Sequence, residues 1–235
     1  MKVIVLLIGI LTITGCSTVS TTHRPMDYYQ GQNNSTPQGA SLFGDTAHGL
    51  SEEAIQKVLS YKLALPSQNR VAILNLTQNN YWRYYSSDFV HLDEETVEGL
   101  VTNLKESNRV YDASFLPSLL VPEKKTLPFL RAAAAQYQAD LLLTYRSNCQ
   151  SFEKYKFIDP NVTKAYCSVE AVAIDTRSGI VPFTAVSTNE FTAEKKEQDI
   201  NFQETRKKAE LKAINAGLSE VSSELRKFIE GMPQL

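Results

Sequence analysis

The sequence predicts an α/β (α+β) domain: a mixed β-sheet with packed helices, an antiparallel C-terminal meander and a long C-terminal helix. Three observations support this class. In the first half, short apolar runs alternate with amphipathic helical stretches, which is the rhythm of an α/β sheet. In the second half, longer strand-like segments are joined by turn residues. Near the end of the chain, apolar residues recur at helical spacing.

The first half is predicted to contain two strand-and-helix steps behind an opening helix. Ser51 can cap that first helix, and Asp93 can cap the next one, with Glu94 and Glu95 at its positive dipole end. The expected elements are a helix over 51–60, a strand over 70–76, a loop over 77–91, a helix from Asp93 that stops at Asn108, a strand over 110–113 and a helix over 126–138.

The second half is predicted to be an antiparallel meander followed by one helix. Gly179 can supply the positive φ that a tight hairpin turn needs. The helix stripe runs from Ala209 to Phe228, and Gly231 is expected just past the helix end. The expected elements are strands over 140–157, 163–174 and 180–191, with turns at 159–161 and 175–179, and a helix over 202–229.

The amino terminus is typical of a lipoprotein export signal. Lys2 precedes an apolar run, Val3 to Ile13, which is shorter than the roughly 20 residues that span a bilayer. Ile13-Thr14-Gly15-Cys16 resembles the lipobox of bacterial lipoproteins, in which the cysteine thiol carries the lipid. Residues 1–15 are therefore expected to be a signal peptide, and Cys16 the lipidated first residue. In those lipoproteins an Asp after the cysteine signals inner-membrane retention, so Ser17 favours the outer membrane of a Gram-negative bacterium.

A polar segment follows the predicted anchor. Residues 16–49 are rich in Ser, Thr, Gln, Asn and Gly and contain few residues that could form a core. We interpret this range as the lipidated cysteine and a flexible tether, with an r.m.s. span of roughly 30 Å. Residues 50–232 are then one periplasmic domain.

Composition and motifs exclude several function classes. The chain has 24 Lys and Arg against 26 Asp and Glu, so no basic excess favours nucleic acid. It contains no Gly-x-Ser-x-Gly elbow and no phosphate-binding glycine motif. Its histidines are His23, His48 and His91, and the acidic residues beside His91 are explained by helix capping. We therefore predict a protein that is not an enzyme and uses no cofactor or metal.

Two cysteines are placed for a disulfide. Cys149 and Cys167 fall on the two arms of the first predicted hairpin, about equally far from its turn. In an oxidising periplasm they are expected to bond, and the cross-link would contribute about 3 kcal/mol. The alternative is a pair of free, half-buried thiols.

An aromatic cluster is the candidate binding site. It follows the first strand, where α/β sheets present functional loops, and it contains the single tryptophan. Aromatic residues with an arginine dominate binding hot spots, but they also close the ends of cores. Both interpretations stay open for the five candidate residues Tyr81, Trp82, Arg83, Tyr84 and Tyr85.

The order of elements resembles a group of bacterial envelope proteins. The resemblance lies in the lipobox Cys16, the strand 71–76 with its capped helix, the segment Ala135-Gln136-Tyr137-Gln138-Ala139-Asp140-Leu141-Leu142-Leu143 and the turn at 175–179. It is similar over residues 65–230 to the periplasmic α/β domain shared by the curli-secretion lipoprotein CsgG, the peptidoglycan-synthase activator LpoB and the amino-terminal domain of TolB. The resemblance implies a non-enzymatic protein that assembles with or binds a partner.

The resemblance does not extend to a channel. A membrane-spanning strand needs about 9–11 alternating residues. The run 152–157 is too short and 192–199 is simply charged, so a pore is disfavoured.

The sequence therefore predicts an outer-membrane-anchored periplasmic lipoprotein that acts as an assembly, secretion-accessory or partner-activating factor. The expected contacts are the membrane, through the N-terminal lipid, and an unknown envelope protein or peptidoglycan. A homo-oligomer is possible by the same resemblance, and nucleic acid is not expected. The alternative is a ligand- or peptidoglycan-binding module that uses residues 79–85. An envelope hydrolase is the third and least favoured interpretation.

Overall fold

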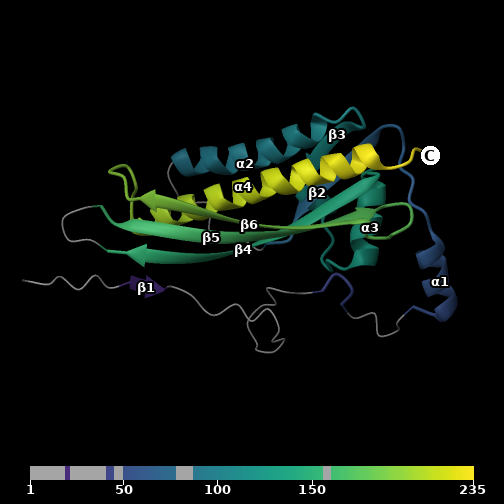
Figure 1. The fold of residues 1–235 in the computed structure, drawn as a ribbon, viewed down its shortest axis with the longest axis horizontal. Helices are drawn as coiled ribbons and strands as arrows, with labels where there is room; N and C mark the ends of the chain where they lie inside the picture. The colour runs from purple at the N-terminus through teal and green to yellow at the C-terminus, as the bar shows by residue number, and fades with distance from the viewer. Residues whose placement is uncertain (1–18, 22–40, 45–49, 78–86, 156–159) are drawn as a thin grey trace, which may run out of the picture.

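The structure is a computed structural model, and it describes residues 19–21, 41–44, 50–77, 87–155 and 160–235 (Figure 1). Its helices and strands follow the alternation that the sequence predicts. The elements are β1 (Val19–Thr21), α1 (Glu52–Ser60), β2 (Asn69–Asn75), α2 (Ser87–Lys105), β3 (Val110–Phe115), a short 3-10 turn (Ser118–Leu120), α3 (Leu127–Gln136), β4 (Leu141–Lys154), β5 (Val162–Asp175), β6 (Phe183–Glu194) and α4 (Phe202–Gly231).

One mixed sheet organises the molecule, in the order β3-β2-β4-β5-β6. The strand β2 pairs in parallel with both β3 and β4, whereas β4, β5 and β6 form an antiparallel meander. The paired part of the β4–β5 hairpin starts at Leu141 opposite Asp175 and ends at Lys154 opposite Val162. The predicted α/β class, with a mixed sheet, a C-terminal meander and a long final helix, is confirmed.

The two faces of the sheet are covered unequally. The helices α2 and α4 lie side by side on one face, and α4 runs along the whole meander (Figure 1). Their core includes Val71, Leu143, Val169, Leu218 and Leu225. The opposite face is covered by α3 over the start of β4, where a smaller core gathers around Ala72, Leu130, Ala134, Leu142 and Ile174. Beyond that point the second face has no helix in the part of the chain that the structure describes.

A buried arginine fixes the end of α4. The guanidinium of Arg109, just before β3, is 9% exposed. It donates hydrogen bonds to the carbonyl of Ile229 at 2.7 Å and to the carbonyl of Met232. It also donates to the carbonyls of Leu65 and Pro66. Carbonyls at a helix end have no partner within the helix, and this cation satisfies them. It thereby links the end of α4 to the segment that precedes β2.

A short strand lies inside the range predicted as tether. Val19–Thr21 pairs antiparallel with the last residues of β4, with Val19 opposite Lys154 and Thr21 opposite Phe152. Strand pairing needs only backbone groups, so a polar sequence does not prevent it. The division into signal peptide (1–15), tether (16–49) and domain (50–232) stays a prediction.

Two element boundaries differ from the prediction. The helix α2 starts at Ser87 instead of Asp93, so part of the predicted loop 77–91 is helical. Phe89, Leu92 and Thr96 already follow helical spacing, whereas the capping pattern drew attention to Asp93. Gly231 is the last residue of α4 and does not lie beyond its end.

The meander boundaries shift as well. The predicted third strand over 180–191 is Phe183–Glu194, because Ile180 still closes the preceding turn by accepting a hydrogen bond from Asp175 and Pro182 has no N–H to donate. The strand β4 ends at Lys154, and residues 156–159 lie outside the described residues.

The first helix contributes nothing to the core. Ser51 caps α1 by accepting the N–H of Ala54, as the sequence predicts, yet none of the residues of α1 is buried. Ile55 is 36% exposed and Leu59 is 74% exposed. Among the described residues, no helix combines the length and apolar character needed to cross a bilayer.

Candidate interaction surface

Most of the sequence-predicted site residues cannot be placed. Cys16 and the aromatic loop Tyr81, Trp82, Arg83, Tyr84 and Tyr85 lie outside the described residues, so lipidation and the binding role of the loop stay predictions. His91 is described: it is exposed on α2, and its Nδ1 lies 3.6 Å from a carboxylate oxygen of Glu94 one turn further on. That pair is a surface contact within one helix and does not form a site with other elements.

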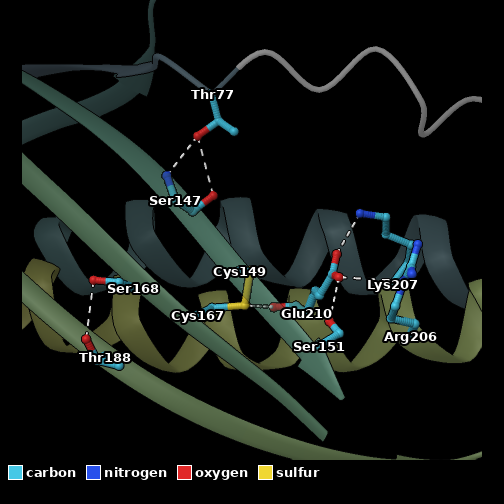
Figure 2. Close-up of a disulfide and its surroundings, with 10 residues drawn as sticks. All are labelled: Thr77, Ser147, Cys149, Ser151, Cys167, Ser168, Thr188, Arg206, Lys207 and Glu210. Carbon is cyan, nitrogen blue, oxygen red and sulfur yellow. Dashed lines mark hydrogen bonds and ion pairs between the residues drawn. A yellow bond between two sulfur atoms is a disulfide. The ribbon is translucent and has the colours of Figure 1, made fainter. Parts of the chain in front are cut away.

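The predicted disulfide is present in the middle of the long hairpin (Figure 2). Cys149 and Cys167 are directly opposed in the β4–β5 register, on the side of the sheet that α4 covers. The Sγ of Cys167 lies 3.4 Å from the backbone carbonyl oxygen of Glu210 in α4. The cross-link therefore holds the two strands together where the helix crosses them.

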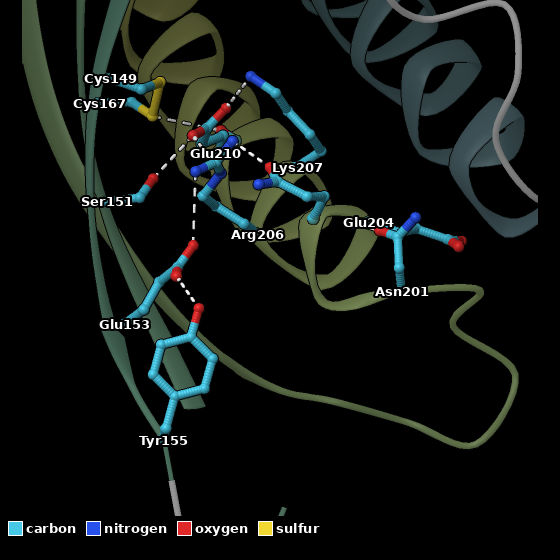
Figure 3. A network of polar contacts seen from close by, with 11 residues as sticks. Cys149, Ser151, Glu153, Tyr155, Cys167, Asn201, Glu204, Arg206, Lys207 and Glu210 are labelled. Atoms are coloured by element: carbon cyan, nitrogen blue, oxygen red, sulfur yellow. Dashed lines mark hydrogen bonds and ion pairs between the residues drawn. A yellow bond between two sulfur atoms is a disulfide. The ribbon is translucent and has the colours of Figure 1, made fainter. Parts of the chain in front are cut away.

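A polar network continues from the disulfide toward the hairpin end (Figure 3). Glu210 accepts a hydrogen bond from the Ser151 hydroxyl at 2.7 Å and pairs with Lys207 at 2.6 Å. Arg206 bridges Glu210 and Glu153, at 3.8 and 3.4 Å. The carboxylate of Glu153 is buried and also accepts the hydroxyl of Tyr155. Each of these charges has a partner under the sheet, and the network thereby attaches α4 to β4.

A second network fixes the turn between β6 and α4. Lys208 pairs with Asp199 at 2.8 Å and with Glu204 at 2.9 Å, and both carboxylates are fully buried. Burial acts to raise the pKa of Asp199, but hydrogen bonds from Lys208, the Lys196 N–H and the Thr205 hydroxyl outweigh it and hold the pKa below its ordinary value. For Lys208, burial acts to lower the pKa, and the two carboxylates raise it above its ordinary value. Asp199 and Lys208 therefore stay ionised near neutral pH, and their ion pair holds the turn.

The opposite face of the hairpin is open to solvent and contains the candidate site. We call this surface the hairpin face; it comprises Gln150, Phe152, Lys164, Tyr166, Val186 and Glu190. The first four line a shallow depression of about 450 Å³. Phe152 and Tyr166 meet edge to face, with ring centroids 5.8 Å apart. Val186, on the neighbouring strand, is 68% exposed. Val186 is opposite Glu170, four residues along β5 from Tyr166, so the aromatic pair and the exposed aliphatic residue lie apart on one face. Exposed aromatic and aliphatic side chains are residue types that protein-binding surfaces use.

The charges of the hairpin face are paired with one another. Lys164 lies 2.8 Å from Glu190 and 4.8 Å from the centre of the Tyr166 ring. The hydrogen bond to Glu190 raises the pKa of Lys164, and the same bond lowers the pKa of Glu190. Further along, Arg146 pairs with Glu170 at 2.6 Å. Paired, exposed charges give orientation and specificity to a contact and supply no group poised for acid–base chemistry.

The sequence indicates which residues share this face, but it does not indicate that the face is exposed. Phe152 and Tyr166 alternate with inward-facing residues along the two predicted strands, so they belong to one side of each strand. Alternation does not say which side a helix covers. The structure shows that α4 covers the side of Cys149 and Ser151, which leaves the aromatic side open.

Comparison with known proteins adds fold-level similarity only. No family model matches the chain, and no curated protein matches it. Among solved structures, a PelC dodecamer from Paraburkholderia phytofirmans matches with a TM-score of 0.36 and 14% identity, covering 71% of this chain and 94% of that one.

Two further structures are similar at the same level. The hypothetical protein CT253 from Chlamydia trachomatis gives a TM-score of 0.37 and 11% identity, covering 69% of this chain and 98% of that one. The lipoprotein GNA1162 from Neisseria meningitidis gives 0.30 and 11%, covering 69% and 99%.

Proposed function

We propose that this chain is an outer-membrane-anchored periplasmic lipoprotein, without enzymatic activity, that binds another protein of the cell envelope through the hairpin face. The observation that carries the proposal is the uncovered half of the meander, where an aromatic pair and an exposed Val186 lie on one face of the sheet. The role that follows is that of an assembly, secretion-accessory or partner-activating factor. Self-assembly into a homo-oligomer is compatible with the same surface.

Two features support the location. The lipobox around Cys16 predicts export and acylation, and three acyl chains anchor a protein firmly. The cross-strand disulfide is typical of an oxidising compartment such as the periplasm, because cytosolic thiols are kept reduced. The location is therefore argued from two independent features, the N-terminal lipobox and the disulfide of the β4–β5 hairpin.

Two features support binding in place of catalysis. The ionisable groups beneath the sheet, Glu153, Arg206 and Glu210 among them, are used in ion pairs that attach α4. The hairpin face, in contrast, exposes aromatic and aliphatic side chains together with paired charges. Such charges contribute to the choice of a binding partner and do not activate a substrate.

The anchor is tested by fractionation. Full-length protein is expected to pellet with outer membranes, and Cys16→Ala to appear in the soluble periplasmic fraction. Ser17→Ala, which leaves the lipobox cysteine in place, serves as the control and should pellet like the wild type. Continued outer-membrane association of Cys16→Ala would contradict the anchor.

The binding face is tested by site-specific photo-crosslinking in living cells. A photoreactive amino acid at Tyr166 is expected to form a discrete adduct with a periplasmic or membrane protein, which mass spectrometry then identifies. The matched control places the same residue at Lys227, on α4, away from the sheet. An adduct from both positions, or from neither, would contradict a role for the hairpin face.

A further inference from the structure

The pairing of β1 places Val19, the described residue nearest the predicted anchor, at one end of the molecule. Because β1 is antiparallel to β4, Val19 lies opposite Lys154, the last residue of β4. Cys16 precedes Val19 by three residues, and three residues span at most about 10 Å. A lipid on Cys16 is therefore held close to the hairpin end and far from α1, which lies at the opposite end (Figure 1).

The same end presents a surface suited to a lipid headgroup region. We call it the tip patch, and it comprises Lys154, Tyr155, Lys195, Lys196 and Ile200. Ile200 is 70% exposed and Tyr155 is 43% exposed. The ring of Tyr155 packs near Phe202 in the first turn of α4, with centroids 5.5 Å apart. Tyrosine at the polar–apolar boundary, with lysines around it, is typical of residues at a membrane interface.

The exposure of Ile200 is built into the fold. Its N–H donates to Glu204 at 2.9 Å, and its neighbour Asp199 is buried with Lys208. Asn201 caps α4 by accepting the N–H of Glu204. Because the turn is fixed on both sides, the Ile200 side chain is held outward, where an apolar layer could bury it.

The tip carries lysines beside carboxylates. Lys154 and Lys196 are exposed and Lys195 is half-buried, next to the exposed Glu194 and Glu197. The buried Asp199 and Glu204 share Lys208, and Glu153 pairs with Arg206. The exposed lysines can meet lipid phosphate groups, and each such contact adds a modest attraction to the lipid anchor.

We propose that the domain stands end-on upon the membrane, with the tip patch in contact with the phospholipid headgroups. The proposal rests on the lipidation of Cys16 in the proposed function. The lipid supplies affinity, and the tip patch with β1 supplies orientation. The end that contains α1 then points away from the membrane, and the hairpin face is presented sideways to partners.

Depth-dependent fluorescence quenching tests this arrangement. Lipidated protein with Trp82→Phe is reconstituted into vesicles of phosphatidylethanolamine and phosphatidylglycerol that contain bromine-labelled acyl chains. Ile200→Trp is expected to be quenched several-fold more than Leu59→Trp, the matched position on exposed α1. Equal quenching of the two, or stronger quenching of Leu59→Trp, would overturn the proposal.

The contribution of the tip lysines to membrane contact is tested with two double variants. In the Ile200→Trp protein, Lys195→Glu with Lys196→Glu should reduce quenching, whereas Lys57→Glu with Lys62→Glu at the α1 end should not. Loss of quenching in both pairs, or in neither, would contradict a specific contact of the tip lysines with lipid phosphates.

A measurement on the native sequence covers the case in which a tryptophan variant fails to fold. Amide hydrogen exchange of residues 195–200 should slow on vesicles relative to detergent micelles, while exchange in α1 stays unchanged. The intact mass of the purified protein separates the two hypotheses. A chain without the lipid mass refutes the proposed function, whereas a lipidated chain with an unprotected tip refutes only the end-on orientation.

Discussion

The parallel and antiparallel halves of the sheet differ in how many faces are buried. Along β4, the residues from Leu141 to Tyr145 are all buried, because α4 covers one side and α3 the other. From Arg146 onward, the strand is no longer continuously buried: residues 146–150 are half-buried or exposed, and only Ser151 and Glu153 are buried again. The strand is the same, but its second half has only one covering helix.

Element lengths explain this difference. The 14 residues of β4 extend about 46 Å, and the 30 residues of α4 extend about 45 Å, so the helix matches the strand. The 10 residues of α3 reach only about 15 Å. The hairpin face is thus the area that a short helix leaves uncovered. A candidate binding surface can arise in this way without any dedicated motif.

The largest expected effect comes from comparing a covered and an uncovered residue on the same side of the sheet. Leu142 and Val186 both point to the α3 side, but Leu142 is fully buried and Val186 is 68% exposed. Leu142→Ala should lower the free energy of unfolding by about 3 kcal/mol through lost burial and a cavity. Val186→Ala should change it by less than about 0.5 kcal/mol. Urea denaturation followed by circular dichroism measures both, and equal losses would show that the hairpin face is covered in the folded protein.

The disulfide gives the next largest effect. Replacing Cys149 and Cys167 together by Ala removes a cross-link between residues 18 apart in sequence. We expect a loss of about 2–3 kcal/mol, since the unfolded chain regains the freedom that the loop had lost. The value is checked by comparing the denaturation midpoint of the wild type, measured with and without reductant, with that of the double variant. An unchanged midpoint would mean that the strand ladder alone fixes the antiparallel half.

Two glycines distinguish how tightly the helices pack. A Cβ on Gly217 of α4 would lie 2.9 Å from Cγ2 of Val169 in β5, whereas one on Gly99 of α2 would meet ordinary contacts at 3.8 Å. Gly217→Ala should destabilise by about 1 kcal/mol, because overpacking outweighs the gain in helix propensity. Gly99→Ala should stabilise by about 0.5 kcal/mol. Thermal unfolding of both variants provides the measurement, and a shift of the same sign in both would refute the close approach of α4 to the meander.

The smallest expected effect is acid sensitivity at the tip. The folded pKa of Asp199 lies below its ordinary value of 3.8, so its contribution to stability is present above that value. The contribution is lost as pH falls through the folded pKa. Unfolding free energies measured from roughly pH 5 to pH 2 should therefore fall less steeply in Asp199→Asn than in the wild type. An identical slope in the two proteins would mean that Asp199 titrates normally.

The sequence predicted the elements well where the pattern was local. The helix α4, the turn at Gly179 and the strand pairing of Cys149 with Cys167 each depend on neighbouring residues, and each is found in the structure. The predicted start of α2 at Asp93 was wrong. The helical spacing of apolar residues begins before Asp93, and it is a stronger signal than a capping residue. The role of residues 81–85 stays a prediction.

The face of the meander that α4 covers was decided by the tertiary structure. Alternation along β4 and β5 marks two sides, and both contain residues that could be buried: Cys149 on one, Phe152 and Tyr166 on the other. The α4 side became the core because its small and paired residues, such as Ala171 and Ser151, let a helix approach closely at Gly217. The sequence by itself determined the order of the elements, the class of the fold and the disulfide partners, since these depend on local pattern. The exposed aromatic face and the grouping of Ile200, Tyr155 and β1 at one end depend on contacts between residues far apart in sequence, and only folding brings those together.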